Sequence, residues 1–219
     1  MTSMTQALFR LDGAVAFVSG AAGHLGQPMV RALAGAGAHV ILNGRNPDRL
    51  ASFAAELSGE GLSCETAAFD MADIAAVRSY FSALPRLDVL VNNAIAMTPK
   101  PFAALEPSDF DITYRSSVTA AFEAVRAALA ALRVAVAATG EARIVNIASM
   151  YGAVAPDKRI YAKPEQASPF HYGQPLSLRP GQSGAVATHP PSGRRIGARA
   201  YSRQRAGAGA FPASASFAG

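Results

Sequence analysis

The stretch AVAFVSGAAGHLG at residues 14–26 decides the fold class of this 219-residue chain. Its first part, residues 14–19, is an apolar run between two glycines, which predicts a buried β-strand. Apolar residues at helical spacing follow over residues 25–36. A glycine-rich turn between a strand and a helix is typical of a phosphate-binding site, because the backbone can approach a diphosphate and the helix N-terminus attracts it. The alternative is an ordinary turn that binds nothing.

The alternation of strand and helix continues along the chain. Further strands are expected at residues 39–42, 63–69, 87–91 and 143–148, with helices at 47–57, 73–81 and 107–138. This pattern predicts an α/β fold in which crossover helices join parallel strands and cover both faces of an open sheet. Ligands of such sheets bind at the carboxyl ends of the strands, so the residues that follow each strand are the candidates for a site.

Composition excludes several classes of protein. Half of the residues are apolar, which is enough for a core. The single cysteine, Cys64, excludes a disulfide scaffold and a cysteine-based zinc site, and we expect no metal site. There is no apolar run of about 18 residues, and residues 1–10 lack the apolar segment of a signal peptide. These observations predict a cytoplasmic protein without a membrane span.

The net charge of +5 comes from the end of the chain. Residues 1–172 hold all 15 acidic residues and 14 of the 20 basic ones, whereas residues 173–219 hold six arginines and no acid. A basic tail can bind nucleic acid, but this one lacks the interleaved aromatic residues of single-strand binders. We therefore expect a solvated tail and no nucleic-acid partner.

Polar residues follow the next three expected strands. Arg45 follows the second, where no acid is present, and an arginine suits the 2′-phosphate of NADP better than the ribose hydroxyls of NAD. The alternative is a solvated surface arginine. Asp70 and Met71 follow the third strand, and Asp70 either accepts a hydrogen bond from an adenine amino group or forms a turn. Asn92, Asn93 and Ala94 follow the fourth strand, and the paired asparagines belong to a site or only form a turn.

After the fifth strand come Ser149, Tyr161 and Tyr172. A serine hydroxyl beside a tyrosine phenol can bind and protonate a carbonyl oxygen. Both residue types are common, so this pairing has meaning only together with the preceding motifs.

Taken together, the motifs resemble the short-chain dehydrogenase/reductase family over about residues 11–173. The resemblance implies a Rossmann-like, doubly wound parallel sheet and reversible hydride transfer between NAD(P)(H) and an alcohol or carbonyl substrate. It implies that Ser149 holds the carbonyl oxygen, that Tyr172 gives it a proton, and that Ser117 occupies the position of a catalytic Asn. The implied cofactor-binding residues are Ser19, Gly20, Gly23, His24, Leu25, Gly26, Arg45, Asp70, Met71, Asn92 and Ala94.

The chain departs from the family pattern at several positions. His24 stands where a glycine is expected, and Ile95 replaces the glycine after Asn-Asn-Ala. Tyr172 lies 23 residues after Ser149, about twice the usual spacing. Tyr161 has the better spacing, but Pro164 follows it where the family forms a helix, so Tyr172 with an inserted loop at residues 153–169 is favoured.

The largest departure begins near residue 173. Leu176 occupies the position of the family's lysine, which lies four residues after its tyrosine. Ala, Gly, Ser and Pro make up 29 of the 47 residues from 173 to 219, without strand or helix periodicity, which predicts a disordered tail. The expected domains are therefore a Rossmann-like domain at 1–173, incomplete at its C-terminal side, and a basic low-complexity tail at 174–219. A frameshift near codon 173 is our hypothesis for its origin, and the alternative is a natural tail.

These features predict an oxidoreductase of NADP, or of NAD, that is weak or inactive as written. A nucleotide-binding module without catalysis is the alternative. The resemblance also implies a small-molecule substrate and a homo-oligomer, although the helix that commonly forms the family's dimer interface is missing from the sequence pattern.

Overall fold

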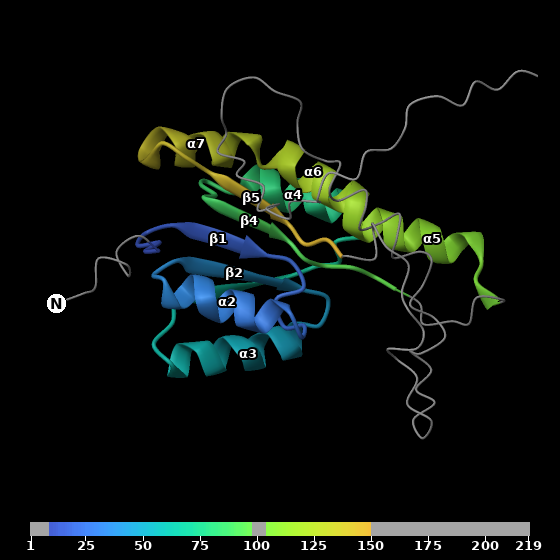
Figure 1. Cartoon of the computed structure of the whole chain (residues 1–219), viewed down its shortest axis with the longest axis horizontal. Coiled ribbons are helices and arrows are strands. Elements are labelled where there is room, and N and C mark those ends of the chain that lie inside the picture. The colour runs from blue at the N-terminus through green and yellow to red at the C-terminus, as the bar shows by residue number, and fades with distance from the viewer. Residues whose placement is uncertain (1–8, 98–103, 150–219) are drawn as a thin grey trace, which may run out of the picture.

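The computed structural model describes residues 9–97 and 104–149, and these form a five-stranded parallel sheet between two layers of helices (Figure 1). The strand order is β3-β2-β1-β4-β5. Strands β2 and β3 are therefore added on one side of β1, and β4 and β5 on the other, so the switch point lies between β1 and β4. All four neighbouring pairs are parallel. The strands are β1 (Val15–Val18), β2 (His39–Gly44), β3 (Cys64–Ala68), β4 (Val89–Asn92) and β5 (Arg143–Asn146). The expected α/β, Rossmann-like doubly wound sheet is confirmed.

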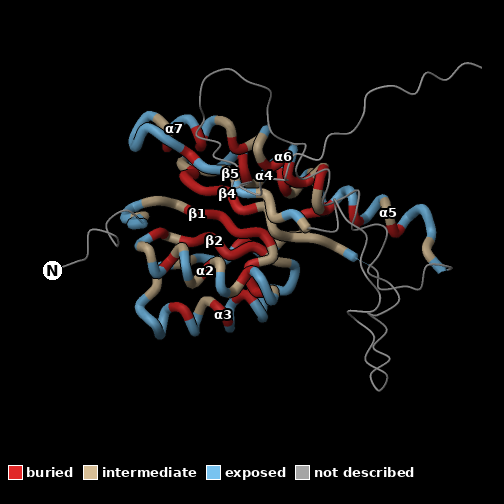
Figure 2. Tube along the Cα trace, viewed as in Figure 1, coloured by how far each residue is buried: buried red, intermediate tan, exposed pale blue. Residues whose placement is uncertain are grey.

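Helices cover both faces of the sheet. They are α2 (Gly26–Gly35), α3 (Pro47–Gly59), α4 (Ile74–Ala83), α5 (Pro107–Tyr114), α6 (Ala120–Ala127) and α7 (Leu129–Thr139). On one face, α2 and α3 pack on Val18, Val40 and Leu42. On the other, α4, α6 and α7 pack on the alternate side chains of the same strands, such as Phe17 and Ile41. The central strands β1, β2 and β4 are consequently buried (Figure 2), whereas the edge strands β3 and β5 keep exposed residues.

Two capping residues explain where helices begin. Asn46 accepts a hydrogen bond from the N–H of Arg49 and precedes Pro47, a favoured first residue of a helix. Asp73 accepts hydrogen bonds from Ala75 and Ala76 at the start of α4, as expected from the sequence.

The expectation that residues 107–138 form largely one long helix is confirmed, since residues 107–127 and 129–139 are helical, but the helix is irregular at two points. A π-helical turn, η2 (Arg115–Thr119), separates α5 from α6, and α7 starts anew after Ala128. The Oγ atoms of Ser116 and Ser117 both donate to the carbonyl oxygen of Thr113, at 3.2 and 2.7 Å. Hydroxyl groups that bond to backbone carbonyls compete with regular helical bonding, which gives a physical reason for the irregular turn.

Strand β5 lies at one edge of the described sheet and is only partly covered. Arg143 and Val145 are exposed, and Val145 retains 42% of its accessible surface. No described helix is long and apolar enough to cross a membrane. The domain boundary expected at residue 173, the tail at 174–219, Tyr161, Tyr172 and Leu176 all lie outside the described residues.

Candidate functional site

A cleft of about 430 Å³ opens at the carboxyl ends of the central strands, at the switch point of the strand order. This is the position expected for a ligand of a doubly wound sheet. Eight of the residues expected to bind a cofactor line it: Gly20, Gly23, His24, Leu25, Arg45, Asp70, Met71 and Ala94. The other lining residues are Asn43, Gly44, Phe69, Asn93, Ile95, Ala96, Met97 and Ser116.

The glycine turn after β1 is shaped by close backbone contacts. Gly20 has a φ of +66°, in the left-handed region that glycine tolerates best. A Cβ on Gly26 would lie 2.1 Å from the carbonyl oxygen of Gly20, so no other residue fits there without movement of the backbone. Helix α2 begins at Gly26 with no side-chain cap and no acidic residue in its first turn. Its N-terminal N–H groups and positive dipole end therefore suit an anion at the cleft.

His24 and Ser19 have different roles in this turn. The His24 side chain is exposed, so the tight turn forms in spite of the missing glycine. Ser19 is buried, and its Oγ accepts hydrogen bonds from the N–H groups of Asn93 and Ala94 at 2.8 and 2.9 Å. The same hydroxyl lies 3.3 Å from the carbonyl oxygen of Val91, to which it donates. Ser19 thus connects the end of β1 to the end of β4.

Arg45 and Asp70 lie at the outer part of the cleft. Arg45 is exposed and forms no ion pair within residues 9–97 and 104–149, and no acid stands beside it at the end of β2. Asp70 uses its Oδ1 to accept the N–H of Ala72 at 2.9 Å, so it forms the turn that the sequence allowed as an alternative. It also lines the cleft, and no hydrogen bond from another described residue reaches its second oxygen, Oδ2. Met71 is 4% exposed and belongs to the core as well as to the lining.

Asn92 turns away from the cleft lining toward β5. Its Nδ2 donates to Oδ1 of Asn146 at 2.8 Å, and its own buried Oδ1 has no partner among the described residues. The neighbouring Asn93, which the sequence placed in the same motif but which was not among the expected cofactor-binding residues, lines the cleft instead and donates from Nδ2 to the carbonyl oxygen of Ser19 at 2.9 Å. Alternation of side chains along an extended segment indicates that the two asparagines face opposite ways, but it does not indicate which of them faces the cleft.

The expected catalytic residues are only partly within the described structure. Ser149 follows β5 and is half-buried, whereas Tyr172 lies outside the described residues, so their pairing stays a prediction. Ser117 donates to the Thr113 carbonyl oxygen and does not line the cleft. Its neighbour Ser116, which the sequence argument missed, does line it, and the Ser116 Oγ accepts the N–H of Ala96 at 2.9 Å.

Comparison with known proteins agrees with this geometry. The family model for short chain dehydrogenases matches residues 14–162. A gluconate 5-dehydrogenase from Gluconobacter oxydans is 35% identical over 152 residues, which are 68% of this chain and 58% of the relative. A 3-oxoacyl-[acyl-carrier-protein] reductase of rhamnolipid biosynthesis from Pseudomonas aeruginosa is 30% identical over 74% of this chain and 65% of the relative. The chain therefore spans about three fifths of the length of these curated relatives.

Solved structures give the same result. The NADP complex of RhlG from Pseudomonas aeruginosa superposes with a TM-score of 0.67 at 28% identity, covering 80% of this chain and 64% of that one. A gluconate 5-dehydrogenase from Burkholderia cenocepacia, solved with NADP and tartrate, has a TM-score of 0.61 at 30% identity, covering 83% of this chain and 65% of that one.

Proposed function

The chain belongs to the short-chain dehydrogenase family, and we propose that it binds NADP and transfers a hydride between this cofactor and a small alcohol or carbonyl compound. The observation that carries the proposal is the glycine-built turn that shares one cleft with Arg45, an arginine without an ion pair among the described residues. Two similar proteins were solved as NADP complexes, which supports the choice of cofactor.

The residues present fit a dinucleotide. Gly20 and Gly26 leave a backbone cradle that a side chain would fill, and the uncapped start of α2 would hold the diphosphate. The forked guanidinium of Arg45 would bind the 2′-phosphate, and Asp70 would accept a hydrogen bond from the adenine amino group. The turn residues Gly23, His24 and Leu25 and the strand-end residues Met71 and Ala94 complete the proposed site, while Ser19 and Asn92 act by holding strand ends.

The chemical step is proposed on the resemblance to the family. A bound nicotinamide would supply or accept the hydride. Ser149 would hold the carbonyl oxygen, Tyr172 would donate a proton to it, and Ser117 would stand in for the family's amide. Leu176 occupies the position of the lysine that assists the tyrosine, so we expect turnover to be slow or absent.

A second candidate is a nucleotide-binding module without turnover. The specific observation in its favour is the Ser117 hydroxyl, which donates to the Thr113 carbonyl oxygen and lies outside the cleft lining. The two candidates differ in turnover and agree in binding, so titration with NADPH followed by an assay with carbonyl substrates separates them.

The cofactor proposal is tested by replacing Arg45 with alanine. Loss of a charge-assisted phosphate contact is expected to raise the NADPH dissociation constant about 10- to 100-fold and to leave NADH binding unchanged. Arg49→Ala, which removes an exposed charge four residues away and outside the cleft, serves as the matched control. Equal NADPH affinities in the two variants would contradict the proposal for Arg45, and a wild-type chain that binds neither nucleotide would contradict the proposed function.

A further inference from the structure

Asn43 is a polar residue at the buried end of β2, where the cleft begins. It is 1% exposed, yet it is among the residues that line the cleft. Its main-chain carbonyl binds the segment after β1, and its side chain binds the end of β3, on the opposite side of β2.

On one side, Asn43 holds the glycine turn. Its carbonyl oxygen accepts the N–H of Ala21 at 2.9 Å, directly after Gly20. The turn is therefore attached to β2 by the backbone of Asn43, as well as to β4 by the hydroxyl of Ser19.

On the other side, Asn43 holds the end of β3. Its Nδ2 donates to the carbonyl oxygens of Ala67 and Phe69, at 3.0 and 3.1 Å. Phe69 and the next residue, Asp70, both line the cleft. The two hydrogen bonds fix the backbone from which the Asp70 carboxylate projects.

The unused half of the amide indicates which atoms of Asn43 matter. Its Oδ1 is buried and has no hydrogen-bond partner among the described residues. A buried acceptor without a partner destabilises a fold, so an amide here is a poor choice for stability alone. Within the part of the chain that the structure describes, the two Nδ2 hydrogen bonds are all the hydrogen bonds that this side chain makes.

We propose that Asn43 is a positioning residue that fixes the glycine turn and the Asp70 segment relative to each other and thereby sets the affinity for the adenosine half of the nucleotide. This inference rests on the proposed function. It assigns the ends of β1, β2 and β3 to one unit, in which the backbone carbonyl of Asn43 holds the glycine turn and its Nδ2 atom holds the end of β3.

The test is Asn43→Asp, which keeps the shape of the side chain and turns both donors into acceptors that face carbonyl oxygens. Asn46→Asp is the matched control, because Asn46 is exposed and only accepts a hydrogen bond, from the N–H of Arg49. It adds the same negative charge on the other side of Arg45. We expect Asn43→Asp to raise the dissociation constants of NADPH and NADH at least tenfold and by similar factors. Asn46→Asp is expected to change either constant less than twofold.

The pair of nucleotides separates positioning from charge repulsion. A carboxylate that only repels the 2′-phosphate would weaken the binding of NADPH and leave the binding of NADH unchanged, and this result would overturn the inference. So would unchanged binding of both nucleotides by a folded Asn43→Asp variant. Asn43→Ser, which is neutral and keeps one donor, is expected to fold. Its affinity for both nucleotides is expected to lie between those of the wild type and of Asn43→Asp.

Amide hydrogen exchange of the free protein tests the same inference without a ligand. Asn43→Asp, compared with Asn46→Asp, is expected to accelerate exchange at Ala21 and Ala72, on opposite sides of β2. If exchange rises there while the wild type binds no nucleotide, the proposed function fails and the positioning role stands. If exchange at these amides is unchanged, the positioning role is overturned.

Discussion

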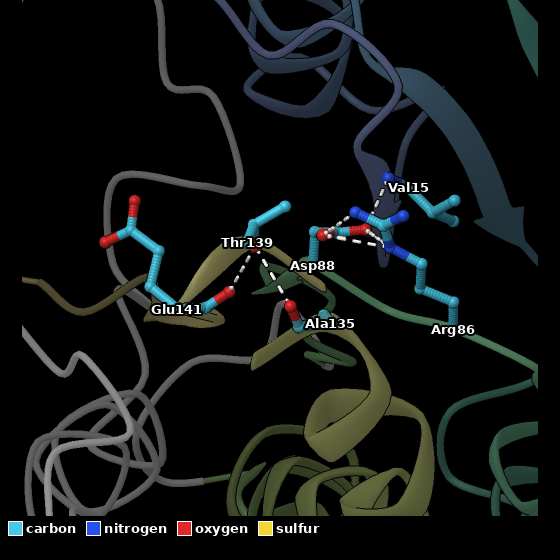
Figure 3. Close-up of polar contacts among 6 residues, drawn as sticks. All are labelled: Val15, Arg86, Asp88, Ala135, Thr139 and Glu141. Atoms are coloured by element: carbon cyan, nitrogen blue, oxygen red, sulfur yellow. Dashed lines mark hydrogen bonds and ion pairs between the residues drawn. The ribbon is translucent and has the colours of Figure 1, made fainter. Parts of the chain in front are cut away.

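The two ends of the parallel strands differ in how their polar groups are used. At the amino end, the carboxylate of Asp88 accepts the N–H of Val15 at 2.9 Å and binds the guanidinium of Arg86 through both oxygens (Figure 3). At the same end, the Thr139 Oγ1 lies 3.0 Å from the carbonyl oxygen of Ala135 (Figure 3).

At the carboxyl end, Arg45 has no ion pair among the described residues, the Asn43 Oδ1 has no partner, and the start of α2 lacks a cap. One end of the sheet is thus closed by internal pairs, while the other keeps charges and backbone donors available. Because both ends belong to one sheet, substitutions can be matched across it: those at the amino end should affect stability, and those at the carboxyl end should affect binding.

The largest expected effect is at Gly26. A methyl group in Gly26→Ala would lie 2.1 Å from the Gly20 carbonyl oxygen, so the turn must deform and NADPH binding should fall more than about 100-fold, by a strain of several kcal/mol. Isothermal titration measures the loss. Gly35→Ala at the other end of α2 meets no atom within 4 Å and should leave binding intact with a slightly higher Tm. Normal NADPH affinity in Gly26→Ala would break the assignment of the carboxyl end to binding.

The next effect is at Asp88, on the closed end. Asp88→Ala leaves a part-buried guanidinium and the Val15 N–H without their acceptor, so the free energy of unfolding should fall by about 3 kcal/mol. Urea denaturation measures it, and the folded fraction should bind NADPH as wild type does. Arg10→Ala, which removes an exposed ion pair with Asp12, is the control and should unfold as wild type does. A change in NADPH affinity with Asp88→Ala would show that the two ends are coupled.

The smallest effect concerns the helical layer, away from both ends. The guanidinium of Arg78 on α4 donates to Glu123 on α6 at 2.9 Å and holds the pKa of this carboxyl below its ordinary value of 4.5. A pKa lowered by folding gives stability that is present above the ordinary value and is lost as the pH falls through the folded one. The Tm difference between wild type and Glu123→Gln should therefore be largest near pH 7 and shrink below about pH 4.5.

The same substitution at Glu141, an exposed partner of Arg143, should leave the Tm unchanged at either pH. A Tm difference at Glu123 that stays constant down to pH 3 would mean that this ion pair contributes no stability through the charge of its carboxylate.

Local sequence patterns predicted the strands and the glycine turn because these depend on nearby residues. The run at residues 14–19 contains β1 and precedes the turn, as its apolar residues and flanking glycines indicated. The interruption at η2 was missed, because apolar periodicity does not report that Ser116 and Ser117 bond to Thr113.

The roles of Asn43 and Asn93 were also missed, for a different reason. Each depends on which strands become neighbours in space, and β1 pairs with β4 across more than 70 residues of sequence. Single residues that follow a strand could be proposed as ligands from position alone. Which of Asn92 and Asn93 faces the cleft required the register of β4 against β5.

The hydroxyl of Ser19 has a consequence for how the molecule folds. Its hydrogen bonds join residues 72 to 75 positions apart, so the end of β1, from which the glycine turn starts, is fixed on this side only when β4 has docked beside β1. Contacts of such high sequence separation form slowly, because the intervening chain must first be closed into a loop. A nascent chain that has emerged only as far as β3 carries every glycine of the turn and its partner Asn43, but it still lacks the β4 segment that Ser19 binds.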